Sequence, residues 1–243
     1  MHIYRPAFAK IVGAPYFLHQ LITGEGDTGV GEEQAQKLEF LEGESNAFAV
    51  CGDGMLVKIN YEAAGLEEML YLLWRTAAQY GAAGIDFRLC PGLSAIAPEE
   101  TDVIVIAGMG GETIITILQD APWTKDGRHT LLLQPMTKAA DLRHWLADNG
   151  YTFTEEHLVE DKGRLYPVLT VTGGTHRALT EAEALCGVLL EGDPLYGACL
   201  SEHAAKLRRS AEGLRRSSAP DAAAQAARMD ALAEELERKR CKV

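Results

Sequence analysis

The sequence lacks any hydrophobic run long enough to cross a membrane. Its best apolar run, residues 103–107, has the length of a β-strand, whereas a membrane helix needs about 18 or more apolar residues. The first residues, MHIYRP, also lack the charged and apolar stretches of a signal peptide. We therefore expect no membrane partner and a cytoplasmic location.

Cysteine is sparse and shows no pattern typical of a structural framework. The five cysteines are odd in number and form no Cys-x-x-Cys pair. They occupy positions Cys51, Cys90, Cys186, Cys199 and Cys241. The sequence therefore predicts neither a disulfide framework nor a zinc site, and we expect no metal and a reducing compartment.

Positive charge is scarce in most of the chain. The net charge is −12, and residues 177–243 hold 11 basic and 11 acidic residues, so residues 1–176 carry the whole acidic excess. An acidic body does not attract a polyanion at long range, so any nucleic acid would have to be bound by local basic patches. The apolar content of 47% is that of an ordinary globular protein.

Strand and helix signals alternate from about Gly65 to residue 172. Strand signals lie at 86–89, 103–107 and 131–134, and a hairpin follows at 151–160 and 164–172. Helix signals lie at 66–80, 112–119 and 138–149. We expect Pro135 to end the strand before the last helix and Thr137 to cap that helix. The alternation predicts an α/β fold with a mostly parallel sheet and an antiparallel edge.

The C-terminal part has helix signals alone. Leu200, Leu207 and Leu214 are seven residues apart, residues 217–221 interrupt the pattern, and helix formers resume at 222–240. This predicts an antiparallel, coiled-coil-like hairpin of two helices. We therefore divide the chain into residues 1–176, an α/β domain, and residues 177–243, a helical hairpin domain. The hairpin is equally compatible with a structural or dimer contact and with a substrate-binding arm.

A glycine-rich turn follows the most apolar strand signal. Ala107 is followed by Gly108, Met109, Gly110 and Gly111, so the strand delivers a turn to the sheet edge where ligands bind in open α/β folds. Glycines allow a backbone to approach a ligand closely. The pattern differs from the Gly-x-Gly-x-x-Gly dinucleotide fingerprint, and an ordinary tight turn between strand and helix explains it as well.

A glutamine follows the next strand signal at the same predicted edge. Gln134 is followed by Pro135 and Met136, and its amide could hydrogen-bond the edge of a nucleobase. The alternative is a glutamine that only satisfies backbone groups at the end of its strand.

Three motifs in a fixed order carry a resemblance to a known family. They are IAGMGGETI from Ile106, LLLQPM from Leu131 with LRHWL downstream, and VEDKGRLYPVL from Val159. With the helical C-terminal part, they resemble the bacterial tRNA adenine-N1-methyltransferases that act at adenine 22, the TrmK family. The resemblance runs from about Arg75 to the C-terminus, about two thirds of the chain. It implies a Rossmann-like, S-adenosylmethionine-dependent methyltransferase domain with a C-terminal helical hairpin, and tRNA as the partner.

The resemblance also implies roles for individual residues. It places the target base beside Gln134, Pro135 and Met136, and it places Gly163 and Tyr166 in the family's hairpin motif. It places the cofactor beside a set of small and apolar residues: Gly92, Leu93, Ala107, Gly108, Met109, Gly110 and Gly111. The expected RNA-contacting residues are basic: Lys138, Arg143, Lys162, Arg164, Arg208, Arg209, Arg215 and Arg216. The alternative for these cations is an ordinary solvated surface.

The N-terminal third departs from the family. Pro91 stands where the family tends to have an acidic residue, and the family's first strand with its cofactor loop is not recognisable in residues 1–74. The nearest candidate for this strand and loop is the segment 48–54. Three explanations remain open: a divergent segment, a degenerate protein, or a reading-frame error upstream of about Arg75. The abrupt change from poorly patterned to strongly patterned sequence favours the reading-frame error. The competing functions are an inactive RNA-binding or adaptor protein and a nicotinamide-dependent oxidoreductase.

Overall fold

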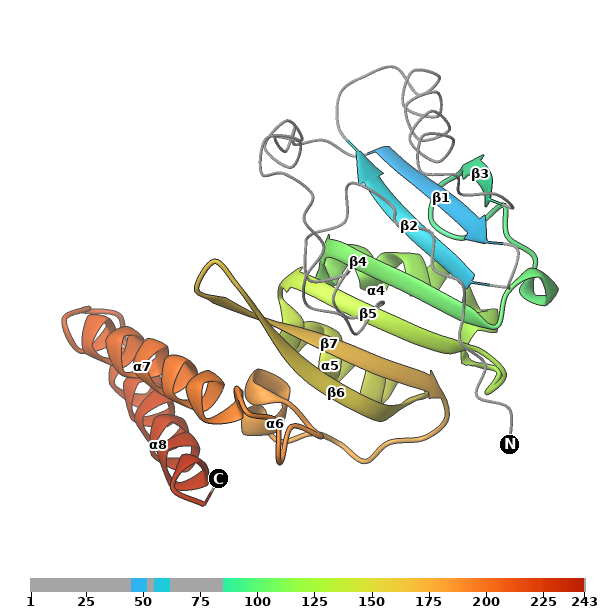
Figure 1. The fold of residues 1–243 in the computed structure, drawn as a ribbon. Coiled ribbons are helices and arrows are strands. Elements are labelled where there is room, and N and C mark those ends of the chain that lie inside the picture. The colour runs from blue at the N-terminus through green and yellow to red at the C-terminus, as the bar shows by residue number, and fades with distance from the viewer. Residues whose placement is uncertain (1–44, 52–54, 62–84, 243) are drawn as a thin grey trace.

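The computed structural model of the chain describes residues 45–51, 55–61 and 85–242, which form a mixed sheet with helices (Figure 1). The seven strands have the spatial order β3-β1-β2-β4-β5-β7-β6. The strands are β1 (Ser45–Cys51), β2 (Met55–Tyr61), β3 (Ile85–Leu89), β4 (Val103–Gly110), β5 (Thr130–Thr137), β6 (Tyr151–Asp161) and β7 (Arg164–Gly173). The helices are α4 (Gly111–Asp120), α5 (Ala139–Asp148), α6 (Glu181–Cys186), α7 (Tyr196–Arg215) and α8 (Ala222–Arg240), with short 3-10 turns at Pro98–Glu100 and Pro122–Lys125.

The strand directions define one functional edge of the sheet. β2 is parallel to β4 and β4 to β5, whereas β1 is antiparallel to both β2 and β3. β2, β3, β4 and β5 therefore point the same way, and we call the edge where they end the carboxyl edge. β7 pairs antiparallel with β5 and β6, which confirms the predicted antiparallel side of the sheet. The result is a Rossmann-like α/β fold.

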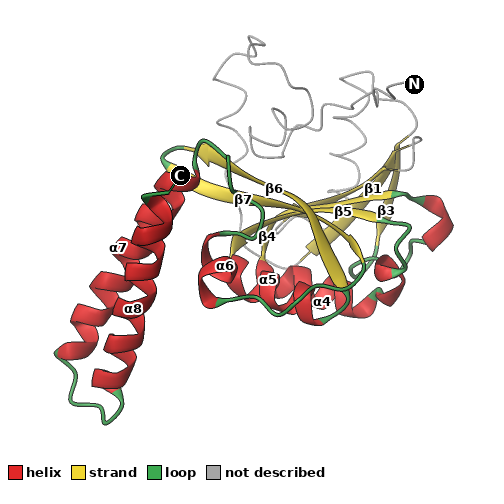
Figure 2. Ribbon diagram, turned by 90° about the horizontal axis from the view of Figure 1, so that it is seen from below, coloured by secondary structure: helices red, strands yellow, loops and turns green. Residues whose placement is uncertain are grey.

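Helices α4 and α5 cover one face of the sheet (Figure 2). Ile104 and Ile106 of β4, at alternate positions, are fully buried, as are Leu131 and Leu133 of β5. In α4, the buried residues include Ile114 and lie three to four positions apart, so they form one face of the helix. These side chains belong to one apolar cluster that holds the helices on the sheet.

Two predicted element ends in this region are wrong. β5 continues through Pro135, which pairs with Met109 across a bulge, and does not end before it. β7 pairs with β5 only as far as Leu133, so the missing N–H of Pro135 removes no ladder bond on that side. The N-cap of α5 is Lys138, in the left-handed conformation with φ +56°, and not Thr137.

The predicted helical hairpin is confirmed, and its base is part of a second core. α7 and α8 extend away from the sheet, and buried Leu200 and Ala204 of α7 share an apolar cluster with Cys186 of α6 and Leu158 of β6. The inner half of the hairpin is therefore packed onto the α/β part of the chain through α6. Within the described ranges, no helix combines the length and the apolar character needed to span a membrane.

Strands β1 and β2 form a β-hairpin, but they do not supply the missing cofactor motif. β1 ends at Cys51, which pairs with Ile85, the first residue of β3. The segment 48–51 therefore runs toward the edge opposite the carboxyl edge, which corrects the proposed match to the family's first strand. Gly52, Asp53 and Gly54, and the predicted helix at 66–80, lie outside the described residues.

Candidate functional site

The glycine-rich turn lies at the carboxyl edge, between β4 and α4. Gly108 has φ +76°, a conformation that favours glycine, and among the described residues no atom lies within 4 Å of where its Cβ would be. Gly111 begins α4, and a Cβ there would lie 2.5 Å from the carbonyl oxygen of Lys138. The turn after β4 is thus held close against the start of α5, which only glycine permits.

Gln134 joins this turn to the end of β5. Its side-chain oxygen accepts a hydrogen bond from the backbone N–H of Gly108 at 2.8 Å, and the side chain is 1% exposed. Its amide nitrogen lies 3.3 Å from the Pro135 carbonyl oxygen and 3.5 Å from the Met136 sulfur. The amide oxygen of Gln134 is therefore already engaged in a hydrogen bond within the protein. The geometry favours the alternative in which Gln134 satisfies backbone groups at the end of its strand.

The loop after β3 reaches the same edge. Gly92 has φ +56°, and the thiol of Cys90 donates to its carbonyl oxygen at 3.4 Å. Leu93 is 2% exposed and lies in the main apolar cluster, so its side chain faces the core. Met109, at 5% exposure, does the same. A cofactor at this edge would therefore meet the backbones of Leu93 and Met109 and not their side chains, and the cofactor contact of both residues stays a prediction.

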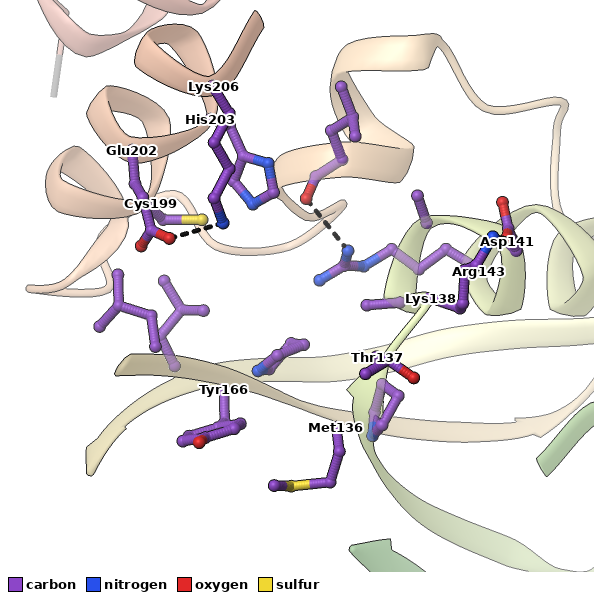
Figure 3. Close-up of a pocket in the computed structure, with 17 residues that line it drawn as sticks. Met136, Thr137, Lys138, Asp141, Arg143, Tyr166, Cys199, Glu202, His203 and Lys206 are labelled. Carbon is purple, nitrogen blue, oxygen red and sulfur yellow. Dashed lines mark hydrogen bonds and ion pairs between the residues drawn. The ribbon is translucent and has the colours of Figure 1, made fainter. Parts of the chain in front are cut away.

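Next to the Gln134–Met136 segment lies a cavity of about 370 Å³. It is bounded by the end of β5 and the start of α5, by the β6–β7 hairpin and by α7 (Figure 3). Met136, 36% exposed, and the ring of Tyr166 lie on one side of it, whereas Cys199, Glu202, His203 and Lys206 come from α7. The cavity thus brings the predicted target-base loop, the hairpin motif and the helical hairpin together.

The charges around the cavity are balanced. Lys138 lies 3.5 Å from Asp141, and Lys206 lies 2.6 Å from Glu202. Each cation at the wall therefore has an acidic neighbour, and the cavity suits a neutral ligand with polar edges better than a phosphate.

Arg143, an expected RNA contact, is a structural residue. It is 1% exposed, its Nε donates to Glu156 at 2.8 Å, and its Nη1 donates to the Ala184 carbonyl oxygen at 2.7 Å. Glu156 in turn accepts the backbone N–H groups of Val188 and Leu189 at 2.6 and 3.1 Å. The Arg143–Glu156 pair thus connects α5 to β6, α6 and the segment after α6. Because Arg143 is buried in this pair, the prediction that it contacts a phosphate is corrected.

The other expected RNA contacts divide into two groups. Arg208 and Arg215 both pair with Asp230 of α8, and Arg208 also lies 3.1 Å from Glu237, so they hold the two helices together. The Glu237 hydrogen bond is the largest cause that raises the pKa of Arg208. Exposed basic residues at the β6–β7 turn and on the outer side of α7 form the second group: Lys162, Arg164, Arg209 and Arg216. Within this group, Arg216 pairs with Glu212 at 2.7 Å.

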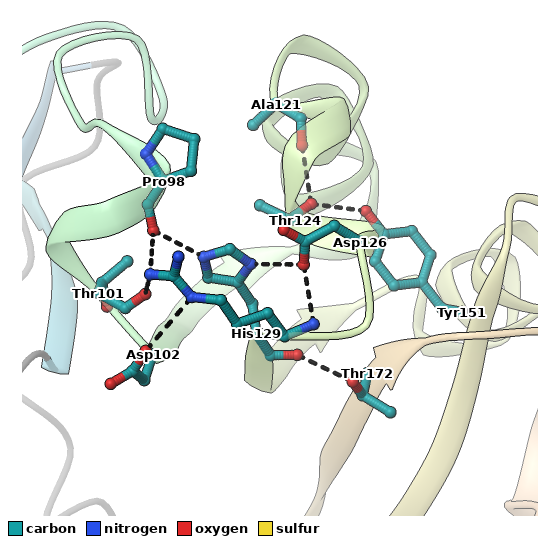
Figure 4. Close-up of polar contacts among 10 residues, drawn as sticks. Pro98, Thr101, Asp102, Ala121, Thr124, Asp126, His129, Tyr151 and Thr172 are labelled. Atoms are coloured by element: carbon teal, nitrogen blue, oxygen red, sulfur yellow. Dashed lines mark hydrogen bonds and ion pairs between the residues drawn. The ribbon is translucent and has the colours of Figure 1, made fainter.

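A buried histidine at the opposite edge of the sheet was not singled out from the sequence. His129 is completely buried, and its two ring nitrogens lie 2.9 Å from Asp126 and from the Pro98 carbonyl oxygen (Figure 4). Hydrogen bonds from the backbone of Arg128 and from His129 lower the pKa of Asp126. Since both nitrogens are engaged and His129 precedes β5, it holds the amino ends of the strands together and does not face the carboxyl edge.

The chain is similar to known methyltransferases. Residues 74–169 match the family model described as a methyltransferase domain. A tRNA (adenine(22)-N(1))-methyltransferase of Bacillus subtilis is 35% identical over 108 residues, which are 44% of this chain and 45% of that protein. The chain thus matches about half the length of this relative.

Solved structures extend the similarity to the fold. The structure of a Streptococcus pneumoniae protein described as a candidate tRNA (m1A22) methyltransferase has a TM-score of 0.60 and 26% identity, covering 72% of this chain and 79% of that one. The same protein in complex with S-adenosyl-L-methionine has a TM-score of 0.59 and 26% identity, covering 72% and 77%. The chain has the Rossmann-like fold of these proteins.

Proposed function

We propose that this chain, a relative of the bacterial tRNA (adenine-22-N1)-methyltransferases, transfers a methyl group from S-adenosylmethionine to N1 of an adenine in tRNA. The observation that carries the proposal is the meeting of the Gly108 turn and the Gln134–Met136 segment at the carboxyl edge, joined by the 2.8 Å bond between Gly108 and Gln134. Open α/β folds bind their ligands at this edge.

The glycine turn fits the methyl donor in our proposal. No described residue fills the position where a side chain of Gly108 would stand, and Gly110 is half-buried beside Thr137, so the backbone can lie against a bulky cofactor. Gly92, after β3, supplies a second backbone approach at the same edge. We assign cofactor contacts to the backbone of these two loops. When bound, S-adenosylmethionine supplies a methyl group on a positively charged sulfur.

The cavity fits the target base in our proposal. Met136 and Tyr166 offer apolar surface on which a planar base can pack, and the balanced charges of the wall suit a neutral adenine. Adenine must leave any stack to enter such a cavity. N1 carries its own lone pair, so the chain's task is to orient the base, and orientation alone supplies a large part of a rate enhancement. Gln134 acts as a positioning residue for the Gly108 turn.

The domains divide this work in our proposal. Residues 1–176 hold the donor and form most of the base cavity, whereas residues 177–243 complete the cavity wall with α7 and contact the tRNA body. Exposed Arg209 on α7, with Lys162 and Arg164 at the β6–β7 turn, can contact phosphates.

The proposal is tested by incubating the purified chain with an unmodified tRNA transcript and S-adenosylmethionine, and by measuring N1-methyladenosine in digested nucleosides by mass spectrometry. Met136→Ala should lower the rate, whereas Leu189→Ala, which removes another exposed apolar side chain (44% exposed), should not. Calorimetric titration with S-adenosylmethionine, and with NADH as the control ligand, separates the competing functions. Binding of neither ligand would support the inactive RNA-binding protein, and binding of NADH alone would support the oxidoreductase.

A further inference from the structure

Two thiols and an imidazole converge where α6 meets α7. Cys186 is the last residue of α6, and Cys199 and His203 lie one turn apart on α7. The two sulfurs and a ring nitrogen of His203 all lie within 4.8 Å of one another. Both cysteines are buried and His203 is half-buried, so the three groups form a compact cluster. Cys199 and His203 also line the cavity, but no chemical role has been assigned to their thiol and imidazole groups.

Apolar packing accounts for the two cysteines but not for the histidine. Buried cysteines often behave as small apolar residues, and Cys186 and Cys199 belong to the second core. His203, however, turns a polar nitrogen toward the sulfurs from the border of that core. Thiolate sulfur and imidazole nitrogen together are the ligands that zinc prefers.

The spacing suits a tetrahedral ion. With zinc–sulfur bonds of about 2.3 Å and zinc–nitrogen bonds of about 2.0 Å, ligand atoms are about 3.5–3.8 Å apart. The three ligand atoms already lie within 4.8 Å of one another. Side-chain rotations that move these atoms by about 1 Å therefore bring them to the distances of a zinc site. Two thiolates also balance the charge of a divalent ion, and nearby Arg143 is neutralised by Glu156.

A fourth coordination position has room on one side. Cys199 and His203 line the cavity, whereas Cys186 is not among the lining residues and belongs to the second core. Three protein ligands on one side and a cavity on the other leave space for a water molecule.

We propose that Cys186, Cys199 and His203 bind one Zn²⁺ ion that ties the end of α6 to the first turns of α7. α6 is held to α5 through Arg143 and the Ala184 carbonyl oxygen. An ion at this point fixes the angle at which the helical hairpin leaves the α/β domain, and it shapes the α7 wall of the cavity. The role is structural and does not depend on the reaction that the chain catalyses.

The test uses the full chain, reduced, stripped of metal with a chelator and titrated with Co²⁺ as a spectroscopic probe. We expect a thiolate-to-cobalt charge-transfer band and the visible bands of tetrahedral cobalt, both saturating at one equivalent and both abolished by added Zn²⁺. Cys199→Ser and His203→Ala should lose these bands. Cys241→Ser, which makes the same thiol-to-hydroxyl change at an exposed cysteine, should retain them.

A second readout keeps the proposal testable if Cys199→Ser does not fold. Zn²⁺ should raise the thermal midpoint of the unmodified chain and of Cys241→Ser, but not that of His203→Ala, whose half-buried side chain can be removed with less disruption. Equal cobalt spectra in the unmodified chain and in His203→Ala would overturn the proposal. A disulfide between Cys186 and Cys199 in the freshly purified chain, found by thiol counting and peptide mass mapping, would also overturn it.

Discussion

Gln134 and Gly108, 26 residues apart in the chain, are joined by a 2.8 Å hydrogen bond from the backbone of one to the side chain of the other. This bond ties the turn after β4 to the end of β5 and so links two neighbouring strand ends at the carboxyl edge. Gly108 has a positive φ and Gln134 is buried, so a substitution at either residue should disturb this contact.

Replacing Gln134 by leucine should disturb the Gly108 turn as well as the base cavity. The partly buried N–H of Gly108 would lose its acceptor, which costs about 1–3 kcal/mol of unfolding free energy. Because a displacement of about 1 Å at a reacting centre can lower a rate by a factor of about 100, we expect methyl transfer to fall about 10- to 100-fold. Denaturant unfolding, calorimetric titration with S-adenosylmethionine and the tRNA assay measure the three effects.

The matched control is Gln119→Leu, on the exposed side of α4, which should leave all three quantities nearly unchanged. A Gln134→Leu chain with normal stability and normal cofactor affinity, but without methyl transfer, would contradict the positioning role. It would indicate direct contact between Gln134 and the base.

Gly111→Ala should destabilise the chain, whereas Gly213→Ala should stabilise it. A Cβ on Gly111 would lie 2.5 Å from a backbone oxygen of Lys138, so α4 and α5 must move apart, at a cost of about 1–3 kcal/mol. A Cβ on Gly213 in α7 meets no atom of the described ranges within 4 Å, and alanine is favoured over glycine in a helix by about 0.5–1 kcal/mol. Equal effects of the two substitutions on the thermal midpoint would show that the turn after β4 is looser than described.

Much of the fold could be predicted from local patterns. The apolar runs of β4 and β5, the hairpin of β6 and β7, and the break between α7 and α8 near 217–221 are all visible in the sequence. The direction of β1 was not predictable in this way. A strand pattern such as 45–51 is the same whether the strand runs parallel or antiparallel, and only its pairing with β2 and β3 decides the direction.

The candidate site was predicted less well because charge in a sequence says nothing about pairing. Arg143 lies in the LRHWL motif and looks like a surface cation, but its partner Glu156 is 13 residues away on another element. Arg208 likewise finds Asp230 on the opposite helix. The Cys186–Cys199–His203 cluster has one local signal in the sequence, the four-residue spacing of Cys199 and His203 in a helical segment. This spacing differs from the Cys-x-x-Cys pattern that predicts most zinc sites.

Arg143→Ala should reduce stability much more than it reduces RNA affinity. It leaves the carboxylate of Glu156 buried without its cation, and breaking a buried pair costs about 3–5 kcal/mol. Arg209→Ala, on the exposed side of α7, should change the unfolding free energy by less than about 0.5 kcal/mol but weaken tRNA binding. The double substitution Arg143→Met with Glu156→Leu should recover only part of the loss, since the N–H groups of Val188 and Leu189 then lack their acceptor.

Denaturant unfolding and filter binding of labelled tRNA measure these two properties separately. If Arg143→Ala unfolds normally and loses tRNA affinity, Arg143 contacts RNA after all, and the buried pair is not what holds α5 to α6.

The start of α6 should respond to acid through Glu183. Its carboxylate pairs with Arg177 and accepts the backbone N–H of Thr180, and the hydrogen bond from Arg177 is the largest cause that lowers the pKa of Glu183 from 4.5 to about 2. A lowered pKa in the folded chain means that the carboxylate stabilises the fold fully above pH 4.5 and that this contribution is lost as the pH falls toward 2.

Glu183→Gln isolates the charge, because the glutamine oxygen can still accept from Thr180. The unfolding free energies of the unmodified chain and of Glu183→Gln should therefore differ by a constant amount above pH 4.5 and converge below it. Glu234→Gln, at an exposed carboxylate of α8 with no ion pair to any described residue, is the control and should show no such convergence. A difference between the unmodified chain and Glu183→Gln that stays constant down to pH 2 would mean that the carboxylate acts at the cap by shape alone.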